Sequence, residues 1–193
     1  MKIVCLGDSI TQGFGVDPNE AWPAVAAALT GYIFINRGVC GDTTGQMLAR
    51  FENHVLKEKP DAAIIIGGVN DIIFIGPHSI CDVQTNLSKM AFKAHNHGIV
   101  PVVGTYPNVC ETTIDGCINY ETVNLSIRKC REFTEIFCKT NKIGYIDFNS
   151  VLQQGSVNHD MKDIIFDGLH PNKNGHRLMA EAIAALPLFH GHN

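Results

Sequence analysis

The sequence predicts an α/β fold, in which a parallel sheet of five strands carries helices on both faces. Short apolar runs alternate with longer segments of helical periodicity, and this alternation is typical of β-α-β units. The strands are expected at residues 2–6, 32–36, 62–66, 99–104 and 145–148. No internal repeat, linker or low-complexity tract interrupts the 193 residues, so we expect a single domain over residues 1–193.

The strands and helices have separate signals. Residues 2–6, which are apolar after Lys2, and residues 62–66 form short apolar runs rich in Ile or Val, as in strands buried on both faces. Pro23 suits the first turn of a helix, where its missing N–H is not needed, and Gly98 suits a helix C-terminus. Helices are expected at 19–28, 45–55, 83–97, 121–140 and 174–185, with a loop at 106–119 and irregular chain at 153–166.

Composition excludes several classes of protein. The formal charge is −4 and no stripe of Lys and Arg stands out, so we expect no nucleic-acid partner. No apolar stretch reaches 18 residues, which argues against a membrane span, and the first apolar run is too short for a signal peptide, which favours a cytoplasmic protein. The seven cysteines lack metal-ligand spacing. We expect free thiols, although Cys110 and Cys117 could bridge in an oxidising setting.

Residues that follow the strands are the candidates for a functional site, because parallel sheets bind ligands beyond the carboxyl ends of their strands. Ser9 follows the first strand, within Gly7-Asp8-Ser9. A serine hydroxyl is a poor nucleophile unless a base removes its proton. His170 is the best candidate for this base, because Asp167 lies three residues before it and can fold back onto the ring. Alone, each of these residues is also compatible with a structural role in a turn or loop.

Acyl-transfer chemistry further requires hydrogen-bond donors for a developing oxyanion. Gly41 follows the second strand, where no side chain would block its N–H, and Asn70 follows the third strand with a side-chain amide. A tight turn is the structural alternative for each.

Together these segments resemble the four sequence blocks of the SGNH hydrolases, also called the GDSL esterase/lipase family, and of its small bacterial thioesterase- and lysophospholipase-like acyl-hydrolases. The blocks occur in order at 7–10, 38–42, 68–71 and 167–170, with Ile10 in place of the usual leucine. The resemblance implies a flavodoxin-like three-layer α/β/α sandwich and no metal or organic cofactor. It also implies that Ser9 attacks a carbonyl, His170 acts as base and Asp167 orients His170. The N–H groups of Ser9 and Gly41 and the side chain of Asn70 would hold the oxyanion.

The substrate is less defined than the chemistry. The apolar run with Ile72, Ile73 and Phe74 would either line an acyl pocket or form the first turn of a covering helix, and residues 106–119 could form a rim or lid. We expect hydrolysis of small-molecule esters or thioesters with short to medium acyl chains. A carbohydrate O-acetylesterase is the alternative of the same mechanism, and a non-catalytic flavodoxin-like binding module is the alternative of another class. The oligomeric state is left open.

Overall fold

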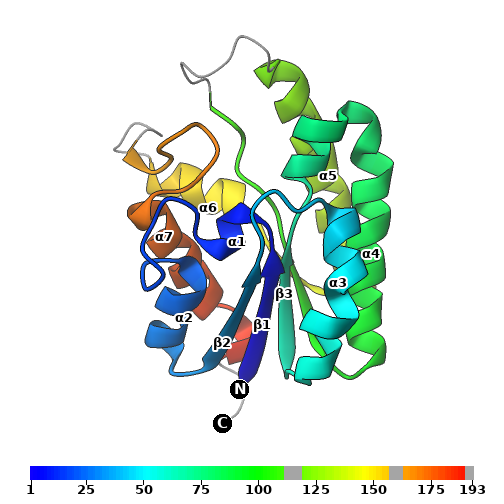
Figure 1. Cartoon of the computed structure of the whole chain (residues 1–193), viewed down its shortest axis with the longest axis vertical. Helices are drawn as coiled ribbons and strands as arrows, with labels where there is room; N and C mark the ends of the chain where they lie inside the picture. The colour runs from blue at the N-terminus through cyan, green and yellow to red at the C-terminus, as the bar shows by residue number, and fades with distance from the viewer. Residues whose placement is uncertain (111–118, 157–162, 190–193) are drawn as a thin grey trace.

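A sheet of five parallel strands forms the centre of the computed structural model, which describes residues 1–110, 119–156 and 163–189 (Figure 1). The strands are β1 (Lys2–Gly7), β2 (Ile33–Gly38), β3 (Ala62–Ile66), β4 (Val100–Gly104) and β5 (Gly144–Ile146). Their order is β2-β1-β3-β4-β5, and every neighbouring pair is parallel. The predicted α/β class is confirmed, and the sheet is wholly parallel. Its order reverses between β1 and β3, the position at which open α/β sheets bind ligands.

Helices cover both faces of the sheet (Figure 1). On one face α2 and α6 pack against α7, and on the other α4 packs between α3 and α5. None of the described helices is both long and apolar enough to cross a membrane. The α-helices are α1 (Ser9–Gln12), α2 (Trp22–Thr30), α3 (Thr44–His54), α4 (Ile80–Asn96), α5 (Tyr120–Asn141), α6 (Phe148–Gly155) and α7 (Lys173–Ala184). A π-helix spans Asp71–Ile75, and 3₁₀ turns span Leu56–Glu58, Pro77–Ser79 and Pro187–Phe189.

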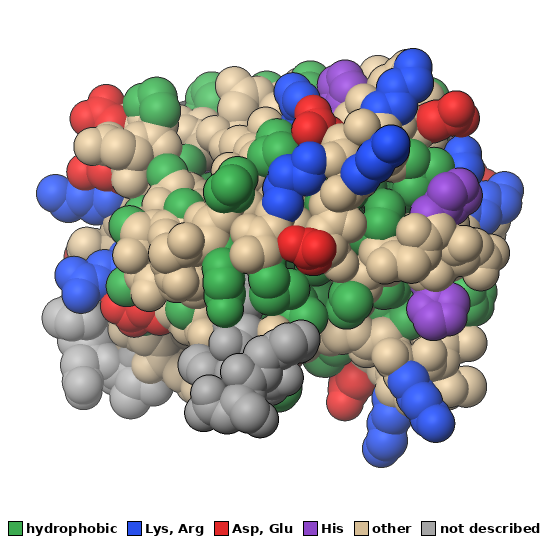
Figure 2. Space-filling view, turned by 90° about the horizontal axis from the view of Figure 1, so that it is seen from below, with side chains coloured by type: hydrophobic (Ala, Val, Ile, Leu, Met, Phe, Trp, Pro, Cys, Tyr) green, Lys and Arg blue, Asp and Glu red, His purple; other side chains and the backbone are tan. Residues whose placement is uncertain are grey.

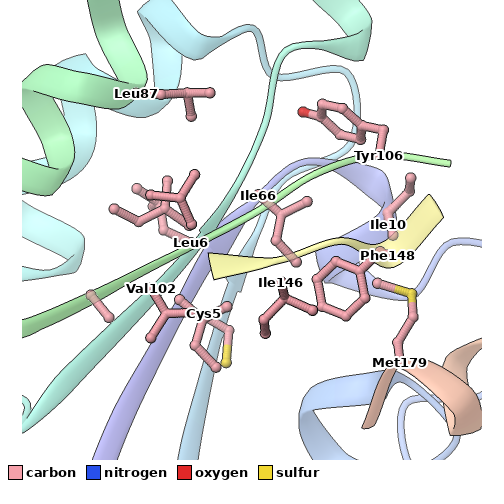
Figure 3. Close-up of a cluster of buried hydrophobic side chains, with 14 of the residues drawn as sticks. Cys5, Leu6, Ile10, Ile66, Leu87, Val102, Tyr106, Ile146, Phe148 and Met179 are labelled. Carbon is pink, nitrogen blue, oxygen red and sulfur yellow. The ribbon is translucent and has the colours of Figure 1, made fainter. Parts of the chain in front are cut away.

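The core lies between the sheet and its two layers of helices. All five residues of β3 are buried, and the helices contribute large, fully buried side chains such as Trp22, Phe51 and Phe148. Figure 3 shows part of this core, in which Phe148 is grouped with Ile146 of β5 and Met179 of α7. Burying each large apolar side chain stabilises the fold by about 1.5–3 kcal/mol, so the sheet is a rigid support for the loops at its edge.

The two edges of the sheet differ in what they present to solvent. The strands begin at the lower edge in Figure 1, and Figure 2 shows this face from below. Lys and Arg side chains are interspersed there with Asp and Glu. Of the residues predicted to be functional, Ser9, Gly41 and Asn70 follow the carboxyl ends of β1, β2 and β3, at the opposite edge.

The structure corrects the prediction at the end of the last strand. β5 ends at Ile146 and Phe148 already belongs to α6, whereas a strand was expected at 145–148 and irregular chain from 153. Asp147 is the N-cap of α6, because its side chain accepts hydrogen bonds from the N–H groups of Asn149 and Ser150. Phe148 is therefore buried as a helical residue.

Candidate active site

Ser9 lies in a sharp turn between β1 and α1. Asp8 caps the short helix, since its Oδ1 accepts a hydrogen bond from the N–H of Ile10 at 3.0 Å. Gly7 must lack a side chain, because a Cβ there would lie 2.1 Å from Thr11 Oγ1. The turn thus holds the Ser9 hydroxyl at the strand's carboxyl end.

The His170 imidazole contacts both Ser9 and Asp167. Nε2 lies 2.9 Å from Ser9 Oγ, and Nδ1 lies 2.6 Å from Asp167 Oδ2. Asp167 Oδ1 also accepts hydrogen bonds from the N–H groups of His170 and Leu169. Burial of the Asp167 carboxyl acts to raise its pKa, but these hydrogen bonds outweigh burial and hold the pKa below its usual range. The carboxylate is therefore ionised near neutral pH, with Nδ1 fixed as the donor.

The loop that carries this pair is held by its own backbone and by aromatic rings. The N–H of Phe166 donates to the carbonyl oxygen of His170, and the N–H of Asn172 donates to that of Ile164. The ring centroid of Phe14 lies 4.6 Å from that of His170, and the ring of Phe166 is stacked at 6.0 Å. These contacts restrict the orientation of the imidazole.

Gly41 and Asn70 reach the same place from the ends of β2 and β3. Gly41 has a φ of 80°, a left-handed conformation that favours glycine, and its N–H has no acceptor among the described residues. Asn70 Nδ2 donates one hydrogen bond to the carbonyl oxygen of Asp42 at 2.9 Å. Because an amide nitrogen carries two hydrogens, the second is left for a ligand.

Asp71 joins the segment after β3 to the start of α3. Its Oδ2 accepts from the Thr44 N–H at 2.8 Å, and its Oδ1 accepts from Thr44 Oγ1 at 2.7 Å. Asn86 Nδ2 donates to Thr44 Oγ1 as well. The segments that carry Gly41 and Asn70 are thus tied to each other by both Asp42 and Asp71.

These groups open into one cavity of about 360 Å³, a size typical of small-molecule sites. No Lys or Arg is among the described residues that line it, and most of this wall is apolar. Ser9, Gly41, Asn70, Asp167 and His170 lie around it together with Phe14, Cys40, Ile73, Phe74, Val109, Cys110, Tyr120, Gly168 and Leu169.

The cavity wall bears on two further sequence predictions. Val109 and Cys110 belong to the expected rim at 106–119, but Cys117, with which Cys110 could bridge, lies outside the described residues. Sequence reasoning overlooked Phe14 and Tyr120, because single aromatic residues in a loop and at a helix start carry no motif.

The apolar run after Asn70 has a divided role. Ile73 and Phe74 line the cavity, as expected for an acyl pocket. Ile72 does not, and its placement there was wrong: the side chain is 2% exposed and belongs to the hydrophobic core. The π-helix turns successive residues to different sides, so the run both lines the cavity and packs as a helical turn.

Asp8 has an environment that the sequence does not reveal. The carboxyl is fully buried, and the Tyr106 hydroxyl donates to its Oδ2 at 3.5 Å. Burial raises the pKa of Asp8 to about 7, although the hydrogen bonds from Ile10 and Tyr106 act to lower it. A carboxyl that titrates near neutral pH thus lies next to Ser9 in the chain.

Known proteins resemble this chain in both fold and sequence. A solved structure of a lipolytic G-D-S-L family protein from Veillonella parvula has a TM-score of 0.81 at 26% identity, with 100% of both chains covered. Arylesterase from Vibrio mimicus is 34% identical over 94 residues, which are 46% of this chain and 46% of that protein. Esterase TesA from Pseudomonas aeruginosa is 32% identical over 102 residues, which are 50% of this chain and 49% of that protein.

The matched segments span about half the length of these two curated relatives. The sequence pattern of the GDSL-like lipase/acylhydrolase family covers more, since it matches residues 5–178 and so includes the Ser9, Gly41, Asn70 and His170 segments. With a wholly parallel sheet and the four segments at its edge, the chain belongs to the GDSL-like lipase/acylhydrolase family.

Proposed function

We propose that the protein is a serine hydrolase that cleaves carboxylic esters or thioesters through an acyl-enzyme on Ser9. The observation that carries this proposal is the continuous series of contacts from Asp167 through His170 to Ser9 Oγ, at 2.6 Å and 2.9 Å. A nucleophile, a base and an orienting carboxylate in hydrogen-bond reach are what nucleophilic acyl transfer requires. Family membership supports the same chemistry.

In the proposed first step, His170 Nε2 takes the proton of Ser9 Oγ as this oxygen attacks the substrate carbonyl carbon. The negative charge moves to the carbonyl oxygen, where the N–H groups of Ser9 and Gly41 and the Asn70 amide would stabilise it. Collapse of this intermediate breaks the bond to the leaving alcohol or thiol, which receives the proton from His170. The product of this step is an ester between the acyl group and Ser9.

In the second step a water molecule attacks the acyl carbon and gives a proton to His170. A second tetrahedral intermediate forms at the same donors and collapses to the free acid, with the proton returned to Ser9 Oγ. Asp167 stays ionised throughout and stabilises the imidazolium that forms in each step. The low pKa of Asp167 supports this role.

The cavity wall supports an uncharged acyl group as the bound part of the substrate. Ile73, Phe74 and Leu169 offer apolar surface beside Ser9. The described part of this wall contains no Lys or Arg that could pair with an anionic acyl chain. Short to medium chains suit a cavity of about 360 Å³. The relatives named arylesterase and esterase TesA are in keeping with ester cleavage.

A carbohydrate O-acetylesterase of the same mechanism is the second candidate. The observation that favours it is the presence of three aromatic side chains in the wall, Phe14, Phe74 and Tyr120, because aromatic rings are typical of the walls of small-molecule sites and can pack against a sugar. A non-catalytic binding module is disfavoured, because binding alone would not require a Ser9–His170–Asp167 series.

The test is a panel of p-nitrophenyl esters from acetate to octanoate, acyl thioesters and acetylated sugars. We expect turnover that peaks at short to medium chains and falls by more than about 10³-fold in Ser9→Ala and His170→Ala. Ser88→Ala, which removes a hydroxyl bonded within α4 to the Gln84 carbonyl, is the matched control. Full activity in Ser9→Ala would refute the mechanism, and activity confined to acetylated sugars would favour the second candidate.

A further inference from the structure

One arginine beneath the active-site edge, Arg50 of α3, contacts three separate segments of the chain. Nε donates to Asp42 Oδ2 at 2.6 Å, Nη1 donates to the carbonyl oxygen of Arg37 at 2.8 Å, and Nη2 donates to that of Gly7 at 2.8 Å. The side chain of Arg50 is only 15% exposed and that of Asp42 only 11%. Each nitrogen of the guanidinium group is therefore used, and each on a different segment.

Two of the three candidate oxyanion donors, Ser9 and Gly41, lie on these segments, and the third, Asn70, is bonded to one of them. The carbonyl that Nη2 contacts lies two residues before Ser9 in the chain, and Asp42 directly follows Gly41. The carbonyl oxygen of Asp42 also accepts the hydrogen bond of the Asn70 amide at 2.9 Å. The ion pair with Arg50 therefore fixes Asp42, which follows Gly41 in the chain and accepts the hydrogen bond of Asn70. Nη2 of Arg50 fixes the end of β1, which leads to Ser9.

We propose that Arg50 is a positioning residue that sets the mutual placement of the three oxyanion donors, an inference that rests on the proposed function. Arg50 is not part of the cavity wall, so it acts through the residues it holds. Placement matters because oxyanion donors act only at hydrogen-bond distance from the developing charge. A misplacement of about 1 Å lowers a rate by roughly 10²-fold.

The arrangement is specific to an arginine. A planar guanidinium carries five N–H donors in a fixed fork and can reach three acceptors at once, whereas a lysine ammonium is a single point of charge. His54 Nδ1 lies 3.1 Å from Nη1 of Arg50. Burial, followed by the charge of Arg50, lowers the pKa of His54 and so favours the neutral form of this ring.

The experiment compares the wild-type chain with Arg50→Lys and Asp42→Asn. Arg177→Lys is the matched control, because Arg177 forms an exposed ion pair with Glu181 on α7. Active sites are first counted by complete reaction with a fluorophosphonate. The measurements are kcat and KM for p-nitrophenyl butyrate and the Ki of an alkyl trifluoromethyl ketone, whose adduct places an oxyanion among the donors. A pH-rate profile completes the set.

Arg50→Lys and Asp42→Asn are expected to lower kcat per active site by about 10- to 100-fold. KM should change by less than about twofold, because the donors act mainly on the charge that develops in the transition state. The Ki of the ketone should rise in parallel with the fall in kcat/KM. The pH-rate profile should keep its shape, since Arg50 contacts neither His170 nor Asp167.

Wild-type kcat and ketone affinity in folded Arg50→Lys would overturn the proposal. A variant with fewer sites that react with the fluorophosphonate but with wild-type kcat per site would overturn it as well, because a purely structural ion pair produces that result. Should Arg50→Lys fail to fold, Asp42→Asn decides by the same measurements. Absence of ester hydrolysis in both the wild type and Arg177→Lys would instead refute the proposed function, and the role of Arg50 with it.

Discussion

Acidification is expected to remove a stabilising contribution of His176 of α7. This side chain is fully buried, and its Nδ1 accepts a hydrogen bond from the backbone N–H of Trp22 at 3.3 Å. Its Nε2 has no hydrogen-bond partner among the described residues. Burial, followed by the charge of His170, lowers the pKa of His176 to about 4. The folded protein therefore holds this ring in its neutral form.

The size and sign of the effect follow from the two pKa values. The pKa of His176 is about 4 when folded and 6.5 ordinarily, a difference equivalent to about 3 kcal/mol of unfolding free energy. Above pH 6.5 neither state binds the proton, and this stabilisation is fully present. As the pH falls from 6.5 toward 4, the unfolded chain binds a proton that the folded protein does not, so the stabilisation is lost.

Urea unfolding between pH 4.5 and 7.5, followed by the fluorescence of Trp22, measures this loss. Trp22 is the only tryptophan of the sequence. In His176→Gln the amide oxygen can still accept from the Trp22 N–H, but nothing titrates there. The difference in unfolding free energy between wild type and His176→Gln should shrink by about 2 kcal/mol from pH 7 to pH 4.5. His97→Gln, at an exposed helix end, is the control. A difference that stays constant over this range would refute the reasoning.

Three further predictions concern the active-site edge. Asp8→Asn keeps an acceptor for the Ile10 N–H but removes a carboxyl whose pKa is raised to about 7. The urea midpoint of Asp8→Asn should therefore increase relative to that of the wild type as the pH rises from 4 to 7. Gly41→Ala should lower the unfolding free energy by about 1–2 kcal/mol in the same assay, since φ is 80° although space for a Cβ is open. Phe74→Ala should change the unfolding free energy by less than about 0.5 kcal/mol, because Phe74 is 71% exposed. Initial rates of this variant should show a larger rise in KM for p-nitrophenyl butyrate than for p-nitrophenyl acetate.

The fold was predictable wherever burial leaves a pattern in the sequence. β1 and β3 are buried on both faces, and this requires the short apolar runs from which they were predicted. The end of β5 was not predictable in this way. Phe148 continues the apolar run of β5, but the side chain of Asp147 caps a new helix there. Apolar spacing over three or four residues does not distinguish the end of a buried strand from the start of a buried helix.

The edge at which Ser9, Gly41 and Asn70 lie was predictable because parallel strands bring their carboxyl ends together. The meeting of Ser9 and His170, 161 residues apart, was implied only by the resemblance to the SGNH hydrolases, because His170 lies between α6 and α7 and does not follow a strand. The orientation of Ile72 was not predictable, since it depends on a π-helical turn that has no sequence signature. The contacts of Arg50 were also out of reach. Two of its three acceptors are main-chain carbonyl oxygens, which any residue type would supply.

The pH responses of Asp8 and His176 oppose each other over nearly the same range. For Asp8, whose folded pKa is raised, stability falls as the pH rises from 4 to 7, because the unfolded chain releases a proton that the folded protein keeps. For His176, whose folded pKa is lowered, stability rises over that range. The two contributions therefore offset each other in part in the wild type. Asp8→Asn should therefore remove the Asp8 slope and leave that of His176, and His176→Gln should do the reverse. The double variant Asp8→Asn/His176→Gln should lose both slopes additively, because no direct contact couples the two described side chains.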